Sequence, residues 1–243
     1  MNLAEHYGTS LHAAELAVPR ILGMQVRDES SRDYGGYLPP DLGYVEPGTS
    51  AGHGGALLLL YCNPDSRYHR DPGILRSATL YLRHLLGAQH EDGTIDLRCT
   101  NFHCSSTIAF TIQGFGYVWR VLDSRGAETA EERETWAMAR RYIERSAEGM
   151  LNGGFHTPNH RWVLVSALSL LYRILGDERL RAEAELYLRE GIDSDADGEY
   201  TERSVGVYNV AVNRSLLIAS EELEMPELLE PVCRNLDSVL RYW

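Results

Sequence analysis

A polar pair of residues begins one strongly apolar stretch of the sequence. Thr157 and Pro158 stand just before Asn159 and His160. Threonine is favoured at the N-cap of a helix, and proline is favoured at its first position. Asn159 and His160 are therefore expected in a first helical turn, where free backbone N–H groups and the helix dipole attract an anion. An amide donor beside an imidazole could hold a carboxylate. The alternative interpretation is local capping with a hydrogen-bonded histidine.

Polar residues of similar type recur at the start of other apolar stretches. Asn101 and His103 occupy the matching place one repeat earlier, and His53 follows Thr49 in a glycine-rich segment, where a structural role is favoured. Tyr208 precedes the last of these stretches. A tyrosine in a basic cavity loses its proton more readily and could then act as a base or an acid. Core packing with a hydrogen-bonded hydroxyl is the alternative for Tyr208.

Four threonines introduce these stretches at similar distances along the chain. They are Thr49, Thr100, Thr157 and Thr201, at intervals of 51, 57 and 44 residues. That period is typical of one helical hairpin per repeat. Residues 162–175 are apolar almost all round, as in a buried helix, whereas residues 177–190 are amphipathic. The sequence therefore predicts an all-α fold of repeated hairpins, an (α/α) toroid in which buried inner helices alternate with half-exposed outer helices.

The number of hairpins predicts an incomplete toroid. The sequence accounts for four hairpins and a further helix near residues 226–242, which is too few to close a ring of this kind. We expect a single toroid domain over residues 1–243 that forms the N-terminal part of a longer protein, because the sequence ends inside an apparent helix. An open ring exposes the flanks of its apolar helices, so self-association is also expected.

Charge and composition argue against several classes of partner. The net charge is −12 and there is no block of Lys and Arg, which argues against nucleic acid and anionic membrane surfaces. No apolar run is long enough to cross a membrane, and the first residues lack the regions of a signal peptide, so a cytoplasmic location is expected. The four cysteines lack zinc-site spacing and are expected to be reduced thiols. No metal is predicted.

An acidic segment lies between the third and fourth apolar stretches. Asp193, Asp195 and Asp197 resemble the opening of a calcium loop, but the twelfth position is Ser204, where such loops need a bidentate glutamate. We therefore interpret the three aspartates as an acidic turn without a tightly bound ion.

Two other groups of side chains are weaker candidates for function. Glu202 and Arg203 are expected to form a structural ion pair with each other. Tyr34 and Tyr37 lie in a long loop rich in glycine and proline, where exposed tyrosines could stack on sugar rings.

Taken together, these motifs resemble the toroid domain of polysaccharide lyases of the heparinase II/III-like and alginate-lyase type. The resemblance is carried by Asn159-His160 at an inner-helix start and by residues 197–202 (Asp-Gly-Glu-Tyr-Thr-Glu), which lead to Tyr208. Residues 92–103 support it, and the similarity covers roughly residues 90–220.

The resemblance implies β-elimination on a uronate-containing glycan, with no metal or organic cofactor. Asn159 and His160 would neutralise the uronate carboxylate, which stabilises the charge that develops as the proton at C5 leaves. Tyr208 would transfer that proton, and His103 would be a second histidine. The implied partner is an acidic oligo- or polysaccharide. The candidate substrate-binding residues are Asn101, Arg161, Arg203, Tyr34 and Tyr37.

Two other functions fit parts of the pattern. A glycoside hydrolase on a similar toroid would need two carboxyl groups across a cleft, and the loops offer Asp96, Asp197, Glu199 and Glu202. A non-catalytic helical-repeat scaffold that binds glycans is the third interpretation. The scaffold is disfavoured because scaffold repeats seldom place Asn, His and Tyr at equivalent helix starts.

Overall fold

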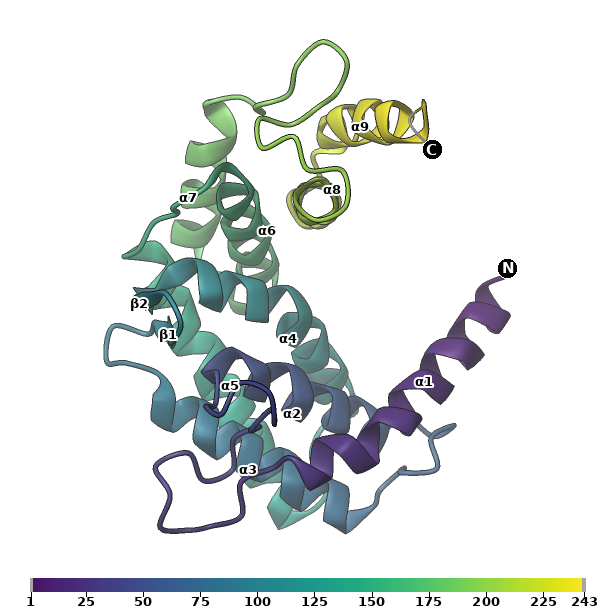
Figure 1. Ribbon diagram of the computed structural model, residues 1–243, viewed down its shortest axis with the longest axis vertical. Helices are drawn as coiled ribbons and strands as arrows, with labels where there is room; N and C mark the ends of the chain where they lie inside the picture. The colour runs from purple at the N-terminus through teal and green to yellow at the C-terminus, as the bar shows by residue number, and fades with distance from the viewer. Residues whose placement is uncertain (1, 242–243) are drawn as a thin grey trace. The chain divides into compact units, whose positions relative to one another are not determined.

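The computed structural model describes residues 2–241, which are mostly helical (Figure 1). The one regular sheet in that part of the chain has two short strands, so the predicted all-α class is confirmed. The elements are α1 (Leu3–Gly23), α2 (Pro47–Cys62), α3 (Pro72–Ala88), β1 (Ile95–Leu97), β2 (Asn101–Cys104), α4 (Ser105–Arg125), α5 (Ala130–Leu151), α6 (Pro158–Leu175), α7 (Glu178–Arg189), α8 (Tyr208–Leu223), a short 3-10 helix (Pro226–Leu228) and α9 (Leu229–Arg241).

Contacts between residues divide the chain into two compact units. Unit 1 contains the residues up to His90 together with Ile95–His103 and Tyr117–Tyr142. Unit 2 contains Glu91–Thr94, Cys104–Gly116 and the residues from Ile143 onward. Helices α4 and α5 therefore contribute one part of their length to each unit.

Unit 1 is built on the hairpin of α2 and α3, which pack side by side. Helix α2 is buried on most of its surface, whereas α3 buries one stripe and exposes the other. The two helices approach closely at Gly54, where an added Cβ would lie 3.0 Å from the Cβ of Tyr81. The predicted alternation of a buried helix with a half-exposed one is confirmed for this hairpin.

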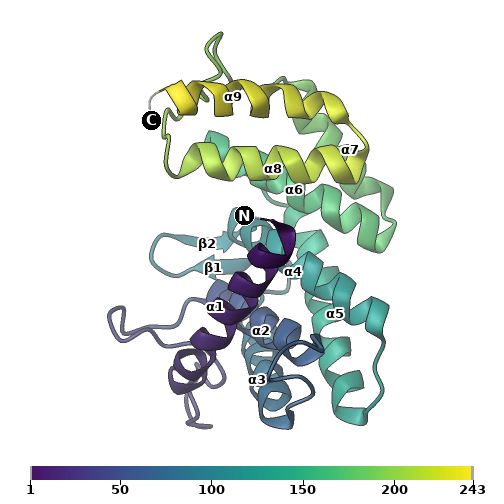
Figure 2. The same cartoon turned by 90° about the vertical axis from the view of Figure 1, so that its right-hand side faces the viewer.

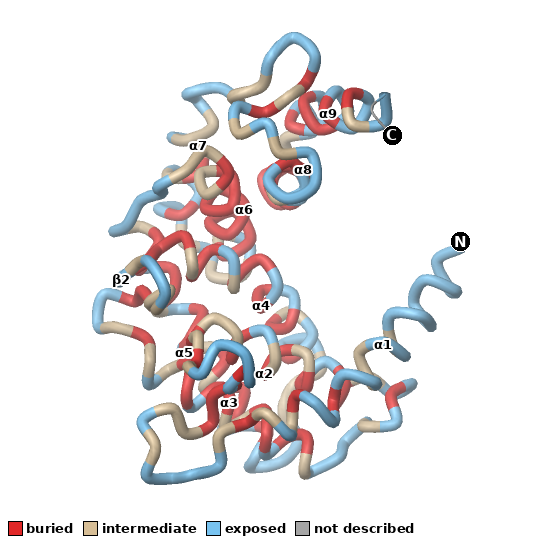
Figure 3. Tube along the Cα trace, in the orientation of Figure 1, coloured by how far each residue is buried: buried red, intermediate tan, exposed pale blue. Residues whose placement is uncertain are grey.

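Unit 2 shows the same alternation around α6. Helix α6 is buried almost throughout, including the fully covered Trp162, and packs against both α7 and α8 (Figures 2 and 3). Helix α7 buries only Leu180 and Ala184 of its twelve residues. Helix α8 has one buried face and one exposed face, and the exposed face carries Val210 and Leu217.

One buried glutamine aligns three helices of unit 2. The Nε2 of Gln113 on α4 donates to the Oγ of Ser166 on α6 (2.7 Å) and to the Oγ of Ser215 on α8 (2.8 Å). These residues lie at nearly the same distance from the start of their helices. Further along, a Cβ at Gly116 of α4 would lie 2.4 Å from a side-chain carbon of Leu170 on α6. At the other end of the helices, Arg173 of α6 pairs with Glu224, the residue that follows α8 (2.6 Å). Helices α4, α6 and α8 therefore run parallel and in register, with their starts at one end of unit 2.

The four threonines that introduce the apolar stretches lie close together two by two, one pair at one end of each unit. Thr157 and Thr201 line one shallow pocket in unit 2. In unit 1, the hydroxyl of Thr49 donates to the backbone carbonyl oxygen of Glu46. The side-chain carboxylate of Glu46 in turn accepts the backbone N–H of Cys99, the residue before Thr100. The arrangement of the hairpins as a toroid stays a prediction.

The Gln113 side chain should contribute measurably to the stability of unit 2. Gln113→Leu keeps the volume but removes the donor that joins Ser166 to Ser215, so we expect a loss of about 1–3 kcal/mol in the free energy of unfolding. Urea denaturation of the variant and the wild type measures this difference. An unchanged unfolding midpoint would show that the polar layer does not hold the three helices together.

Candidate functional site

The start of α6 is held by a hydroxyl and by a carboxylate from a distant loop. Thr157 occupies the N-cap position with extended backbone, as predicted, but its side chain does not cap the helix. Its hydroxyl donates instead to the Oδ1 of Asn159 (2.6 Å). The backbone N–H of Asn159 donates to the Oε2 of Glu202 (2.8 Å), and Asn159 is only 3% exposed. The chain thus places its own carboxylate where the helix dipole favours an anion.

Two sequence-based expectations need correction here. The first turn of α6 does not offer the Asn159 N–H to an outside anion, because Glu202 accepts it. A ligand carboxylate would therefore have to be bound by side-chain donors. The expected Glu202–Arg203 ion pair is also wrong, because the Arg203 guanidinium lies 3.5 Å from the carboxylate of Asp195. Arg203 has positive φ, and neighbouring side chains in such a turn point in different directions.

His160 follows Asn159 in the same turn and is half-buried. Burial lowers the pKa of its imidazole, and the nearby His156 lowers it further. The ring is therefore neutral at pH 7. Its Nδ1 is buried without a hydrogen-bond partner in the described part of the chain, and Phe110 of α4 packs edge-on at 5.4 Å between ring centroids. A neutral imidazole retains one N–H donor and one acceptor nitrogen.

Helix α8 begins with Tyr208, whose side chain is 42% exposed. The next residue, Asn209, is buried and lies with its Nδ2 3.5 Å from the Oε2 of Glu199. Tyr208 is thus partly exposed to solvent at the helix start, while Asn209 contacts the preceding loop through Glu199.

A buried relay of hydrogen bonds fixes the loop between α7 and α8. The Tyr200 hydroxyl donates to Asn213 of α8 (2.8 Å), Asn213 donates to Asn235 of α9 (2.8 Å), and Asn235 donates to the carbonyl oxygen of Gly198 (2.9 Å). Gly198 has φ +89°, and a Cβ there would lie 2.6 Å from the backbone of Arg234. The relay therefore determines where this loop delivers the carboxylate that caps α6.

His103 belongs to unit 1. The sequence-based prediction placed Asn101 and His103 at the start of a helix, but both lie on strand β2, before α4 begins. The Oδ1 of Asp96 is 2.7 Å from the Nε2 of His90 and accepts the backbone N–H of His103 (2.9 Å). The two imidazoles stack with centroids 3.9 Å apart. Although burial favours a higher pKa for Asp96, these hydrogen bonds lower it. The sequence reasoning missed His90, and its spacing from Asp96 gave no distinctive signal.

Two of the candidate substrate-binding residues, Arg161 and Tyr37, contact other residues of the protein. Arg161 donates to the carbonyl oxygens of Tyr187 and Gly191 and lies over the ring of Trp162, so it ties α6 to the end of α7. Tyr37 is buried and lies 4.1 Å from His53 between ring centroids. The expectation that Tyr37 is exposed for sugar stacking is therefore wrong.

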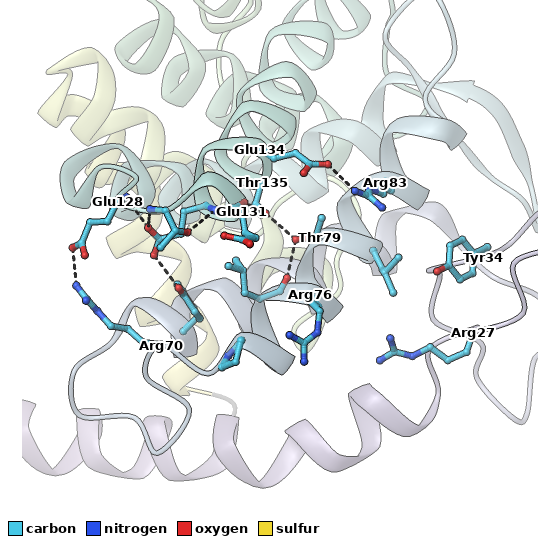
Figure 4. Close-up of a pocket in the computed structure, with 16 residues that line it drawn as sticks. Arg27, Tyr34, Arg70, Arg76, Thr79, Arg83, Glu128, Glu131, Glu134 and Thr135 are labelled. Carbon is cyan, nitrogen blue, oxygen red and sulfur yellow. Dashed lines mark hydrogen bonds and ion pairs between the residues drawn. The ribbon is translucent and has the colours of Figure 1, made fainter.

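Unit 1 contains a groove of about 730 Å³, which Tyr34 helps to line (Figure 4). Arg70 pairs with Glu128 and Arg83 pairs with Glu134, each at 2.6 Å. These pairs fasten the α3 side of the groove to the α5 side, and they use four of the eight charged side chains that line it.

Two shallow pockets open in unit 2, one beside the α6 start and one on the loop between α7 and α8. One has a volume of about 300 Å³ and includes Thr157, Arg161 and Thr201, and the other has about 360 Å³ and includes Arg203. Asn159, His160 and Tyr208 are not among their lining residues, so a common cavity for these three residues stays a prediction.

In the acidic turn, a side-chain carboxylate accepts hydrogen bonds from backbone N–H groups of the same turn. The Oδ1 of Asp195 accepts the N–H groups of Asp197 (3.0 Å) and Glu199 (2.9 Å). Within residues 2–241, no group of three or more His, Cys, Asp or Glu side chains is arranged to hold a metal ion.

We predict no tight calcium site at Asp193, Asp195 and Asp197. Calorimetric titration with calcium should give no heat of binding in the micromolar range, because the glutamate that would supply two oxygen ligands is replaced by Ser204. Micromolar binding that disappears in Asp195→Ala would contradict this prediction.

No protein-family model matches the sequence, and no curated protein matches it either. None of the described helices is long and apolar enough to cross a membrane. The resemblance to polysaccharide lyases, drawn from residues 92–103, Asn159-His160 and residues 197–208, stays a prediction.

Proposed function

We propose that this chain binds a uronate-containing glycan and cleaves it by β-elimination. The observation that supports this most is the parallel packing of α6 and α8, which are joined through Gln113 near their middles and by the Arg173–Glu224 ion pair at their ends. Because both helices start at the same end of unit 2, their first turns bring an amide, an imidazole and a phenol to that end. These are Asn159, His160 and Tyr208.

In the proposed reaction, side-chain donors hold the uronate carboxylate. The Nδ2 of Asn159 and the N–H of the neutral His160 imidazole would donate to its oxygens. The proton at C5 lies beside this carboxylate, so donors that stabilise the developing negative charge lower the barrier to its removal. A neutral His160 suits this role because it adds a hydrogen-bond donor without forming an ion pair. An ion pair would stabilise the bound substrate as much as the transition state and would not accelerate the reaction.

Tyr208 would carry the proton. As phenolate it would take the proton from C5, the C–H electron pair would form the C4–C5 double bond, and the C4–O bond would break. The leaving oxygen would then receive a proton from the tyrosine. The products are a sugar with a free hydroxyl and an unsaturated uronate, and no water is consumed.

Hydrolysis is the second candidate because the loop before α8 carries Glu199 and Glu202 close to both helix starts. The Glu202 carboxylate accepts from Asn159, and that of Glu199 accepts from Ser238 (3.3 Å). Both carboxylates thus have structural partners. Hydrolysis would also need one carboxyl to activate water and another to protonate the leaving group.

Incubation with a panel of uronate-containing glycans tests the proposal. Elimination creates a conjugated double bond, so ultraviolet absorbance should rise with at least one acidic glycan and with none of the neutral ones. Cleavage without new absorbance would support hydrolysis, and neither binding nor cleavage of any acidic glycan would overturn the proposal.

Asn159→Ala should weaken both binding and turnover. The amide would contact the carboxylate before and during proton removal, so its loss raises KM and lowers kcat/KM, each by roughly 10-fold or more. Steady-state kinetics of the variant checks this. Arg214→Ala, an exposed position on α8, is the control and should behave as wild type. A variant at Asn159 with unchanged KM would remove this residue from the binding site.

A further inference from the structure

The amide of Asn159 is held in one orientation by its neighbours. The 2.6 Å separation between the Thr157 hydroxyl and the Asn159 Oδ1 is typical of an O–H···O hydrogen bond and short for N–H···O. The hydroxyl therefore donates and the amide oxygen accepts. The Glu202 carboxylate fixes the backbone of the same residue through its N–H.

This orientation leaves the nitrogen end of the amide without an acceptor among residues 2–241. The Nδ2 of Asn159 donates to no atom of residues 2–241, and it is not among the fully buried atoms without a partner. An amide nitrogen carries two N–H donors and accepts nothing. The Thr157 hydroxyl thus fixes which end of the Asn159 amide faces it: the oxygen points toward Thr157 and the nitrogen points away.

We propose that Thr157 is a positioning residue that turns the Nδ2 donors of Asn159 toward the ligand and thereby gives the site its preference for a carboxylate over a neutral sugar. A carboxylate only accepts hydrogen bonds and matches two N–H donors, whereas the carbinol of a neutral sugar must also donate. This inference rests on the proposed function for its substrate class, but the orientation of the amide is independent of any substrate.

Substitution at Thr157 can test this without removing a helix cap, since the Thr157 side chain makes no capping hydrogen bond. Thr157→Val keeps the shape and removes the hydroxyl, and Thr157→Ser keeps the hydroxyl. Thr201→Val is the matched control, because Thr201 lines the same pocket but its hydroxyl donates to the carbonyl oxygen of Asp193 (3.3 Å) instead of to Asn159.

The first measurement is the Kd for an acidic oligosaccharide and for its carboxyl-reduced form of the same length. We expect Thr157→Val to lose about 10-fold of the preference for the acidic form, because the amide can then rotate. Thr157→Ser and Thr201→Val should keep the wild-type preference. A Thr157→Val protein with an unchanged preference would overturn the inference.

The second measurement needs no substrate. The side-chain amide signal of Asn159 in the nitrogen–proton NMR spectrum can be assigned by its loss in Asn159→Asp. The signal should shift in Thr157→Val and stay in place in Thr157→Ser. If the wild type binds no acidic glycan, the proposed function fails, and the spectrum alone decides whether Thr157 orients Asn159. An unshifted signal in Thr157→Val would overturn that role.

Discussion

Tyr208→Phe should abolish turnover of a uronate glycan while leaving its binding nearly unchanged. The substitution removes one hydroxyl from a side chain that is 42% exposed, so it creates no buried cavity and should leave the fold intact. Only the proposed proton-transfer group is lost, and such groups contribute typically about 10²–10⁴-fold to the rate. Turnover followed by absorbance, together with the Kd from calorimetry, separates the two effects.

The outcome also distinguishes the two candidate reactions. A hydrolase that uses Glu202 should tolerate Tyr208→Phe and lose its activity in Glu202→Gln. A useful control is Tyr200→Phe, because the Tyr200 hydroxyl is buried and donates to Asn213. That variant should lose stability without losing proton transfer. Full activity in Tyr208→Phe would end the elimination hypothesis.

Glu132→Ala should be among the most destabilising single changes in unit 1. The Glu132 carboxylate is 1% exposed and lies 2.9 Å from the guanidinium of Arg125. It also accepts the Tyr61 hydroxyl (2.9 Å) and the backbone N–H groups of Glu128 (2.7 Å) and Thr129 (3.1 Å). Removal of one partner from a buried ion pair costs about 3–5 kcal/mol, because the remaining charge is left uncompensated. Urea denaturation measures the loss.

The same site predicts how acid affects unit 1. Burial alone would raise the pKa of Glu132, but the hydrogen bonds from Glu128, Thr129 and Tyr61 and the charge of Arg125 together lower it to about 2. The stabilisation from this lowered pKa is present above the unfolded-state value of 4.5 and is lost as the pH falls from there through about 2. In Glu132→Gln, this part of the acid sensitivity should disappear.

A matched control is available at the other glutamate of this turn. Glu128 forms an ion pair with Arg70 in which both side chains are more than half exposed. Exposed pairs contribute about 0–1 kcal/mol, so Glu128→Ala should have little effect on the unfolding free energy. Equal effects of Glu128→Ala and Glu132→Ala would contradict the importance given to burial.

The helical hairpins were predictable because their pattern is local. Apolar residues all round α6 and on one stripe of α7 indicate a buried and a half-exposed helix directly from the sequence. Thr157 and Pro158 likewise marked the helix start correctly. The polar layer around Gln113 was not predictable, since its partners lie 53 and 102 residues away.

The details of the candidate site depend on contacts that sequence spacing does not reveal. Glu202 caps a helix that begins 44 residues earlier, so only the fold brings them together. Asn101 and His103 resemble a helix start in sequence, yet they pair with β1 in a short sheet. Tyr37 lies in a segment rich in glycine and proline that suggests exposure, and it packs on His53.

The source of the oxygen in the product tests the proposed elimination most directly. The glycan is cleaved in water labelled with heavy oxygen, and the fragments are weighed by mass spectrometry. Elimination predicts unlabelled fragments, one of which carries an unsaturated uronate, because the C4–O bond breaks and the oxygen stays with the leaving sugar. Incorporation of one labelled oxygen at the new reducing end, with no unsaturated product, would contradict the account.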